Sequence, residues 1–140
     1  MIKEKFNLNG KVAVITGASK GIGKAIALGF AEFGAHVVIS SRNEEAVKIV
    51  EDEFKSKGFS VSSQKCHVGN NDDRVNLIEN TLKAHGSIDI LVNNAGTNPY
   101  FGPIHKMPAE AYQKTMDINL NSAIELSNLV YPIMKSQNSG

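Results

Sequence analysis

The sequence lacks several features that mark whole classes of protein. It has a single cysteine, Cys66, in 140 residues, so no disulfide can form within the chain, which favours a reducing compartment. The charged start Met1–Lys5 has no apolar core and does not resemble a secretory signal. No apolar run reaches the roughly 20 residues of a membrane-spanning helix. We therefore expect a cytoplasmic protein with no membrane partner; a peroxisomal location, whose signal stands at a C-terminus, stays open.

An excess of charge of one sign is also lacking. The 15 basic and 14 acidic side chains leave a formal net charge of +1. Such a chain has no basic field to attract a phosphate backbone, so we expect no nucleic-acid partner. The composition, 41% hydrophobic and 21% charged residues, is that of an ordinary globular protein. The length predicts one domain over residues 1–140.

Short apolar runs alternate with segments of helical period along the chain. The runs predict strands over 12–16, 36–41, 61–68 and 88–92. The helical segments predict three helices ended by glycines and a fourth helix over 109–135; the three glycines are Gly34, Gly58 and Gly86. Right-handed crossovers then predict an α/β fold, a doubly wound parallel sheet of Rossmann type with strand order 3-2-1-4. Ligands of such sheets bind at the carboxyl ends of strands one and four.

The turn between the first strand and the first helix is rich in glycine. It runs from Thr16 to Gly23 and has glycines at positions 17, 21 and 23. Gly17 permits a tight turn, Gly21 lets a pyrophosphate approach the backbone, and Gly23 permits close packing of the helix on the strand. The free N–H groups of the first helical turn then face the phosphates. A glycine-rich turn without a ligand is the alternative, but the flanking strand and helix favour a dinucleotide.

Two cations stand near the expected position of the adenosine ribose. Ser41 and then Arg42 stand at the end of the second strand, at the place where an acidic residue would bind the ribose hydroxyls of NAD. A guanidinium there can bind a 2′-phosphate, and Lys20 of the glycine turn can reach the same group. Solvated surface charge is the alternative for both cations. We predict NADP(H) as the cofactor.

Three motifs together resemble those of the short-chain dehydrogenase/reductase family in order and spacing. They are Thr16–Gly23, Asn93-Asn-Ala-Gly96 and Asn119. The resemblance covers all 140 residues, and Cys66–Gly69 and Asn98–Gly102 are similar to the NADPH-dependent carbonyl and retinal reductases of that family. It implies an oxidoreductase that interconverts a carbonyl and an alcohol by hydride transfer. It also implies a small-molecule substrate and a homo-oligomer.

The resemblance also implies which residues bind the cofactor. They are Gly17, Ser19, Lys20, Gly21, Ile22, Gly23, Ser41, Arg42, Val68, Asn94, Ala95 and Gly96. Val68 is expected to line the adenine pocket, and Asn93 to Gly96 to close strand four against the adenosine half. His67 departs from the family pattern, in which an acidic residue often contacts the adenine amino group. We assign His67 no proton chemistry, and we predict no metal site.

Asn119 is the one catalytic residue that the resemblance implies within these 140 residues. It matches the asparagine of the family's proton relay; an asparagine that bonds only to local helix backbone is the alternative. The family's serine, tyrosine and lysine belong to a strand and helix expected after Gly140. We therefore expect the 140 residues alone to be inactive. A catalytically silent nucleotide-binding fragment or interaction module is the alternative function.

A second tyrosine–lysine pair has the family's spacing but not its setting. Tyr131-x3-Lys135 lies on the same predicted helix as Asn119, with no strand between them. We interpret Tyr131 as a packing residue and Lys135 as a terminal helix cation.

Apolar surface is expected where the predicted fold ends. Strand four should form an open sheet edge. Apolar residues of the last helix should pack against elements outside these 140 residues or against a second subunit; they are Ile118, Leu126, Leu129, Val130 and Ile133.

Overall fold

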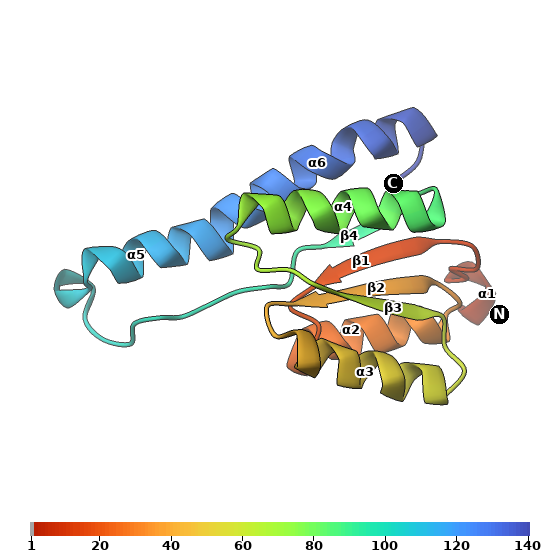
Figure 1. Cartoon of the computed structure of the whole chain (residues 1–140), viewed down its shortest axis with the longest axis horizontal. Coiled ribbons are helices and arrows are strands. Elements are labelled where there is room, and N and C mark those ends of the chain that lie inside the picture. The colour runs from red at the N-terminus through yellow and green to blue at the C-terminus, as the bar shows by residue number, and fades with distance from the viewer. Residues whose placement is uncertain (1) are drawn as a thin grey trace.

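The structure, a computed structural model, describes residues 2–140. Four parallel strands form one sheet in the order β3-β2-β1-β4 (Figure 1). They are β1 (Val12–Thr16), β2 (His36–Ser41), β3 (Val61–Lys65) and β4 (Ile90–Val92). The predicted doubly wound α/β sheet and its strand order are confirmed.

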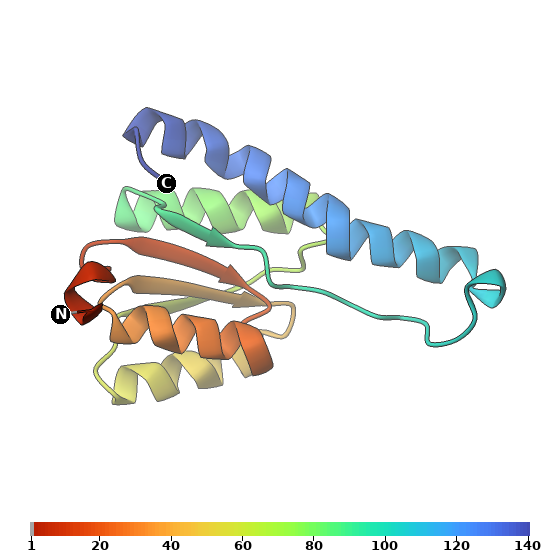
Figure 2. The ribbon, with the colours of Figure 1, turned by 180° about the vertical axis from the view of Figure 1, so that it is seen from behind.

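Helices cover both faces of the sheet. α2 (Gly21–Glu32) and α3 (Glu44–Ser56) lie on one face, and α4 (Asn71–His85) and α6 (Ser122–Gln137) lie on the other (Figures 1 and 2). Shorter elements complete the chain: α1 (Ile2–Lys5), the 3-10 turn η1 (Ile104–Lys106), α5 (Ala109–Met116) and the π-helical turn η2 (Asp117–Asn121). No helix in residues 2–140 is long and apolar enough to cross a membrane.

β1 is buried on both faces, which explains its almost continuous apolar sequence, whereas β3 and β4 are mostly half-buried. Ala13 and Ile15 of β1 pack into the core under α2 and α3, whereas Val12 and Val14 pack into the core under α4 and α6. All five residues of β1 are buried. Successive side chains of a strand point to opposite faces, so a helical layer on each face requires an apolar residue at every position.

Two strands are shorter than predicted, because backbone groups next to them form hydrogen bonds with side chains outside the sheet. β3 ends at Lys65 instead of residue 68: the backbone N–H of His67 donates to Asp73 at 2.8 Å, inside the turn that leads to α4. β4 begins at Ile90 instead of residue 88. The backbone N–H and C=O of Ile88 bond the side-chain amide of Gln137, each at 3.0 Å.

The predicted last helix is one continuous helical run with a wider turn inside it. α5, η2 and α6 follow one another without a break and continue to Gln137, two residues beyond the predicted end at 135. The segment after β4 runs outward to the start of α5, and the long helical run returns over the sheet (Figure 2). β4 pairs with β1 and forms the sheet edge in the part of the chain that the structure describes, as expected.

The expected surroundings of the last helix are wrong for Leu126 and Val130. Leu126 and Val130 are buried within this chain, against a core that contains Leu77 and Ile78 of α4. Ile118, Leu129 and Ile133 are partly buried against the same core. α4 thus supplies the partner that we had placed outside the 140 residues.

The packing interpretation of Tyr131 is also wrong. Its side chain is 63% exposed. The Lys135 ammonium lies 5.8 Å from the centre of the Tyr131 ring, a distance that allows a cation–π contact. The pair therefore forms a surface contact near the C-terminal end of α6.

Candidate functional site

A pocket of about 380 Å³ opens at the carboxyl ends of the strands. It contains ten of the twelve predicted cofactor residues, all except Ile22 and Gly23. The lining consists of Gly17, Ser19, Lys20, Gly21, Ser41, Arg42, Cys66, His67, Val68, Asn94, Ala95, Gly96, Thr97, Lys114 and Ile118. Ile22 is 74% exposed in the first turn of α2, and Gly23 is buried in the same turn.

Two glycines of the turn after β1 have backbone conformations that disfavour other residues. Gly17 has φ +65° and Gly21 has φ +58°, the left-handed region that favours glycine. A Cβ on Gly17 would lie 2.9 Å from the Ala95 Cα, so this turn is tight as predicted. A Cβ on Gly21 would meet no atom within 4 Å. The space beside Gly21 is open, which suits the predicted approach of a phosphate.

Gly23 was predicted to let the first helix pack closely on the strand. In the structure, the groups closest to it belong to Gly17 and Asn94. A Cβ there would lie 2.4 Å from the Asn94 side-chain nitrogen and 2.5 Å from the Gly17 carbonyl oxygen. The neighbours of Gly23 are therefore the glycine turn and the residues after β4. This glycine lets three segments meet beneath the pocket.

Thr16 joins the ends of β1 and β4. Its Oγ1 accepts hydrogen bonds from the backbone N–H groups of Asn94 and Ala95, both at 3.1 Å, and donates to the Val92 carbonyl at 3.3 Å. Asn94 also bonds the end of β1 through its side chain: its amide donates to the carbonyls of Thr16 at 3.0 Å and Gly17 at 3.1 Å. The sequence analysis placed Thr16 at the end of a strand and at the start of the glycine turn, but it did not predict these hydrogen bonds. A hydroxyl at the last position of a buried apolar strand was the available signal.

The N-terminus of α2 is free to bind an anion. Lys20 occupies the N-cap position in an extended conformation, and no side chain caps the helix. The first turn contains no acidic residue. Uncapped N–H groups and the positive end of the helix dipole favour a phosphate at this place.

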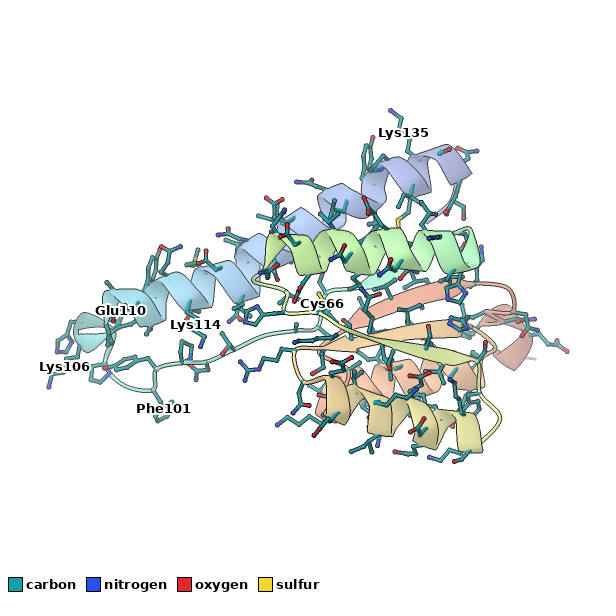
Figure 3. All side chains as sticks on the ribbon, viewed as in Figure 1. Cys66, Phe101, Lys106, Glu110, Lys114 and Lys135 are labelled. Carbon is teal, nitrogen blue, oxygen red and sulfur yellow. The ribbon has the colours of Figure 1, made fainter. Side chains whose placement is uncertain are left out.

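The pocket is positively charged. Three cations line it, Lys20, Arg42 and Lys114, and none of the described residues in the lining carries a carboxylate. Within residues 2–140, no ion pair involves any of the three. Lys114 lies on α5, on the side toward the segment that follows β4 (Figure 3). Lys114 and Ile118, one helical turn apart, were missed by sequence reasoning, although their i, i+4 spacing places them on one face.

Asn119 connects the last helical run to the segment after β4. Its Oδ1 accepts from the Thr97 N–H at 2.7 Å, and its Nδ2 donates to the Thr97 carbonyl at 2.8 Å. A Cβ on Gly96 would lie 3.6 Å from Asn119 Oδ1. The side chain therefore bonds across 22 residues of chain, not to its local helix backbone. Asn119 holds the rim of the pocket.

Cys66 lies at the inner wall with its thiol protected. It is 2% exposed. Burial, followed by the nearby Asp73 carboxylate, raises the pKa of the thiol to about 11, while Arg74 acts in the opposite direction. A thiol with such a pKa is a poor nucleophile at neutral pH. Cys66 therefore contributes shape to the pocket and not reactivity.

Comparison with known proteins identifies the family. Residues 11–140 match the family profile described as short chain dehydrogenase. This chain belongs to the short-chain dehydrogenase family. It is 42% identical over 133 residues to the human protein "Dehydrogenase/reductase SDR family member 4", an alignment that covers 95% of this chain and 48% of the relative. This short-chain dehydrogenase chain thus spans about half the length of the curated relatives it matches.

Solved structures of other short-chain dehydrogenases superpose closely on this one. A metagenomic short-chain oxidoreductase in complex with NADP is 37% identical with a TM-score of 0.90, covering 95% of this chain and 60% of that one. A gluconate 5-dehydrogenase from Burkholderia cenocepacia, in complex with NADP and tartrate, is 31% identical with a TM-score of 0.92. That match covers 100% of this chain and 55% of the other.

Proposed function

We propose that this chain is the NADP(H)-binding part of an oxidoreductase that interconverts a carbonyl and an alcohol. The observation that carries the proposal is the pocket itself: Lys20 and Arg42 line it together with an uncapped helix N-terminus, and no carboxylate of the described lining opposes them. A dinucleotide with a 2′-phosphate carries more negative charge than one without it. The charge of the pocket therefore favours NADP(H) over NAD(H). Two solved relatives are themselves complexes with NADP.

Each part of the pocket fits one part of such a cofactor. The N–H groups at the start of α2 and the open side of Gly21 would hold the pyrophosphate. Arg42 would bind the 2′-phosphate through paired N–H groups, with Lys20 as a second cation. Asn94, Ala95 and Gly96 would form the opposite wall, held by Thr16. When bound, NADP(H) supplies or accepts the hydride.

The proposed role of Asn119 is to position groups near the substrate. Its Oδ1 and one hydrogen of its Nδ2 bond Thr97 in this structure, which fixes the side chain, and a neutral amide does not act as an acid. The described residues, 2–140, contain no strand after α6 that could bring a serine, tyrosine and lysine to the pocket. We therefore expect no reduction of small ketones or quinones by this chain alone. NADPH oxidation that disappears in Tyr131→Phe would contradict this expectation.

The cofactor preference can be tested by titration with nicotinamide fluorescence as the readout. NADPH should bind tighter than NADH by on the order of tenfold or more, because a hydrogen bond to a charged partner contributes about 1.5–3 kcal/mol. Arg42→Asp should remove or invert the preference. Lys83→Glu, which makes the same change of charge on the exposed end of α4, should preserve it. Equal affinity for the two dinucleotides in the unaltered chain would refute the 2′-phosphate argument.

We also propose that the protein acts on a small carbonyl or alcohol, forms a homo-oligomer and is cytoplasmic. The open edge of β4 and the exposed apolar residues of the last helical run support an oligomer; these are Tyr112, Leu120, Ile124 and Tyr131. Light scattering over a concentration series tests it. A monomer at every concentration contradicts it.

A further inference from the structure

The end of the pocket at β3 is built for a flat apolar group. If the pyrophosphate lies at α2 and the ribose lies at the end of β2, the base must continue toward the end of β3. The lining there contains Cys66, Val68 and Ile118. An aromatic base fits between such side chains, and the residue at its edge is His67. The inference below rests on the proposed binding of NADP(H).

The imidazole of His67 has a defined hydrogen-bonding pattern. The backbone N–H of Gly69 donates to its Nδ1 at 3.1 Å. A ring nitrogen that accepts carries no hydrogen, so the hydrogen of this imidazole is on Nε2. Within the described residues, no acceptor bonds that Nε2. His67 therefore has a free donor, and the residue lines both this pocket and a neighbouring hollow that also includes Glu110 and Asp117.

The position of the ring is fixed by its surroundings. The His67 backbone N–H donates to the Asp73 carboxylate at 2.8 Å. Gly69 leaves room for the ring: a Cβ there would lie 2.8 Å from His67 Cε1 and 2.7 Å from Ile118 Cδ1. A glycine beside the ring thus lets His67 and Ile118 approach each other at the edge of the pocket.

One backbone carbonyl in this wall already accepts a hydrogen bond. The buried guanidinium of Arg74 donates from NH1 to the Val68 carbonyl at 2.7 Å. Arg74 is 9% exposed. The described lining contains no carboxylate, and at this end of the pocket the free donor is Nε2 of His67.

We propose that His67 makes the base site of this chain a hydrogen-bond donor site, which binds a 6-oxopurine dinucleotide at least as well as the adenine one. Adenine carries an amino donor at position 6, and hypoxanthine carries a carbonyl acceptor at the same position. A donor at residue 67 satisfies the carbonyl directly, whereas a carboxylate at that residue would satisfy the amino group and repel the carbonyl.

The test compares NADPH with reduced nicotinamide hypoxanthine dinucleotide phosphate, whose base has a carbonyl at position 6 and a hydrogen on the neighbouring N1. Nicotinamide fluorescence reports the binding of both. The unaltered chain should bind the hypoxanthine form as tightly as NADPH or tighter. His67→Asp should favour NADPH by about tenfold or more, because only the adenine amino group can donate a hydrogen bond to the new carboxylate. His67→Asn, whose amide can either donate or accept, should bind the two forms within a few-fold of each other.

The possible results separate this inference from the proposed function. Binding of neither dinucleotide would overturn both. Tight binding of NADPH with a tenfold preference over the hypoxanthine form in the unaltered chain would overturn the role of His67 and leave the proposed function standing. A ratio unchanged by His67→Asp would do the same. Because a new carboxylate would lie near Asp73, circular dichroism should verify that His67→Asp is folded. If it is not folded, the base preferences of the unaltered chain and of His67→Asn test the role of His67.

Discussion

Two glycines of α2 make a matched pair that tests the geometry beneath the pocket. Gly23→Ala would place a Cβ 2.5 Å from the Gly17 carbonyl oxygen and 2.4 Å from Asn94 Nδ2. Ordinary van der Waals contacts begin about 1 Å farther out, so backbone must move. Gly29→Ala places a Cβ in the same helix with no atom within 4 Å. The two variants make the same chemical change in opposite surroundings.

The expected effects have opposite signs. Alanine is better than glycine inside a helix by about 0.5–1 kcal/mol, and Gly29→Ala should gain that amount. Gly23→Ala gains the same propensity but also incurs an overpacking cost of about 1–3 kcal/mol. For 140 residues, an unfolding entropy of about 2.1 cal/mol/K per residue converts 1 kcal/mol to about 3 °C in Tm. Gly29→Ala should therefore melt about 2–3 °C higher, and Gly23→Ala several degrees lower.

Calorimetry and NADPH titration together check both variants. Gly23→Ala should weaken NADPH binding because the displaced groups, Gly17 and Asn94, line the pocket. Gly29→Ala should leave binding unchanged. If Gly23→Ala melts as high as Gly29→Ala and binds NADPH normally, the close approach of α2 to the glycine turn is wrong.

Three other predictions concern single residues. Thr16→Val should lower the free energy of unfolding by about 2–4 kcal/mol, because two N–H groups lose their acceptor; Thr16→Ser keeps the acceptor and should lose about 1 kcal/mol in urea unfolding. Cys66, 2% exposed and with its pKa raised to about 11, should react with iodoacetamide at pH 7.5 only after unfolding, and rapid alkylation in the native chain contradicts this. Burial, followed by the nearby His85, lowers the pKa of His36 from 6.5 to about 4. The folded chain resists protonation of His36 while the unfolded chain accepts it, so stability present above pH 6.5 should fall by about 1–2 kcal/mol toward pH 4, after allowance for the partial exposure of the ring. His36→Gln should flatten that part of the pH profile; an unchanged slope contradicts the assignment.

The sheet was predictable because its signals are local. Val12–Thr16 is continuously apolar since both of its faces are covered, and a continuous apolar run followed by Gly17 is readable without a structure. The side-chain caps of α3 and α4 are equally local: Asn43 and Asn70 accept from N–H groups three residues ahead, at 3.0 Å each.

The features that sequence reasoning missed depend on contacts between distant segments. The side-chain amide of Gln137 bonds the backbone N–H and C=O of Ile88, 49 residues earlier. These groups are then not available to the sheet, and β4 is shorter. The burial of Leu126 follows from the position of α6 on α4, which no periodicity specifies. Thr16 and Lys114 belong to the site only because the fold brings β4 and α5 to the end of β1. Composition and spacing report the faces of an element, but they do not report which other element covers a face.

The π-helical turn at Asp117–Asn121 divides the last helical run into two parts with different angular phase. Before it, Lys114 lines the pocket, and Ile118 lines the pocket from within the turn; after it, Leu126 and Val130 enter the core against α4. A π turn accommodates one residue more than a regular helix, and one residue corresponds to about 100° of rotation. Deleting one residue there would restore a regular helix while turning Lys114 away from the pocket, so this segment should tolerate substitutions far better than changes in length.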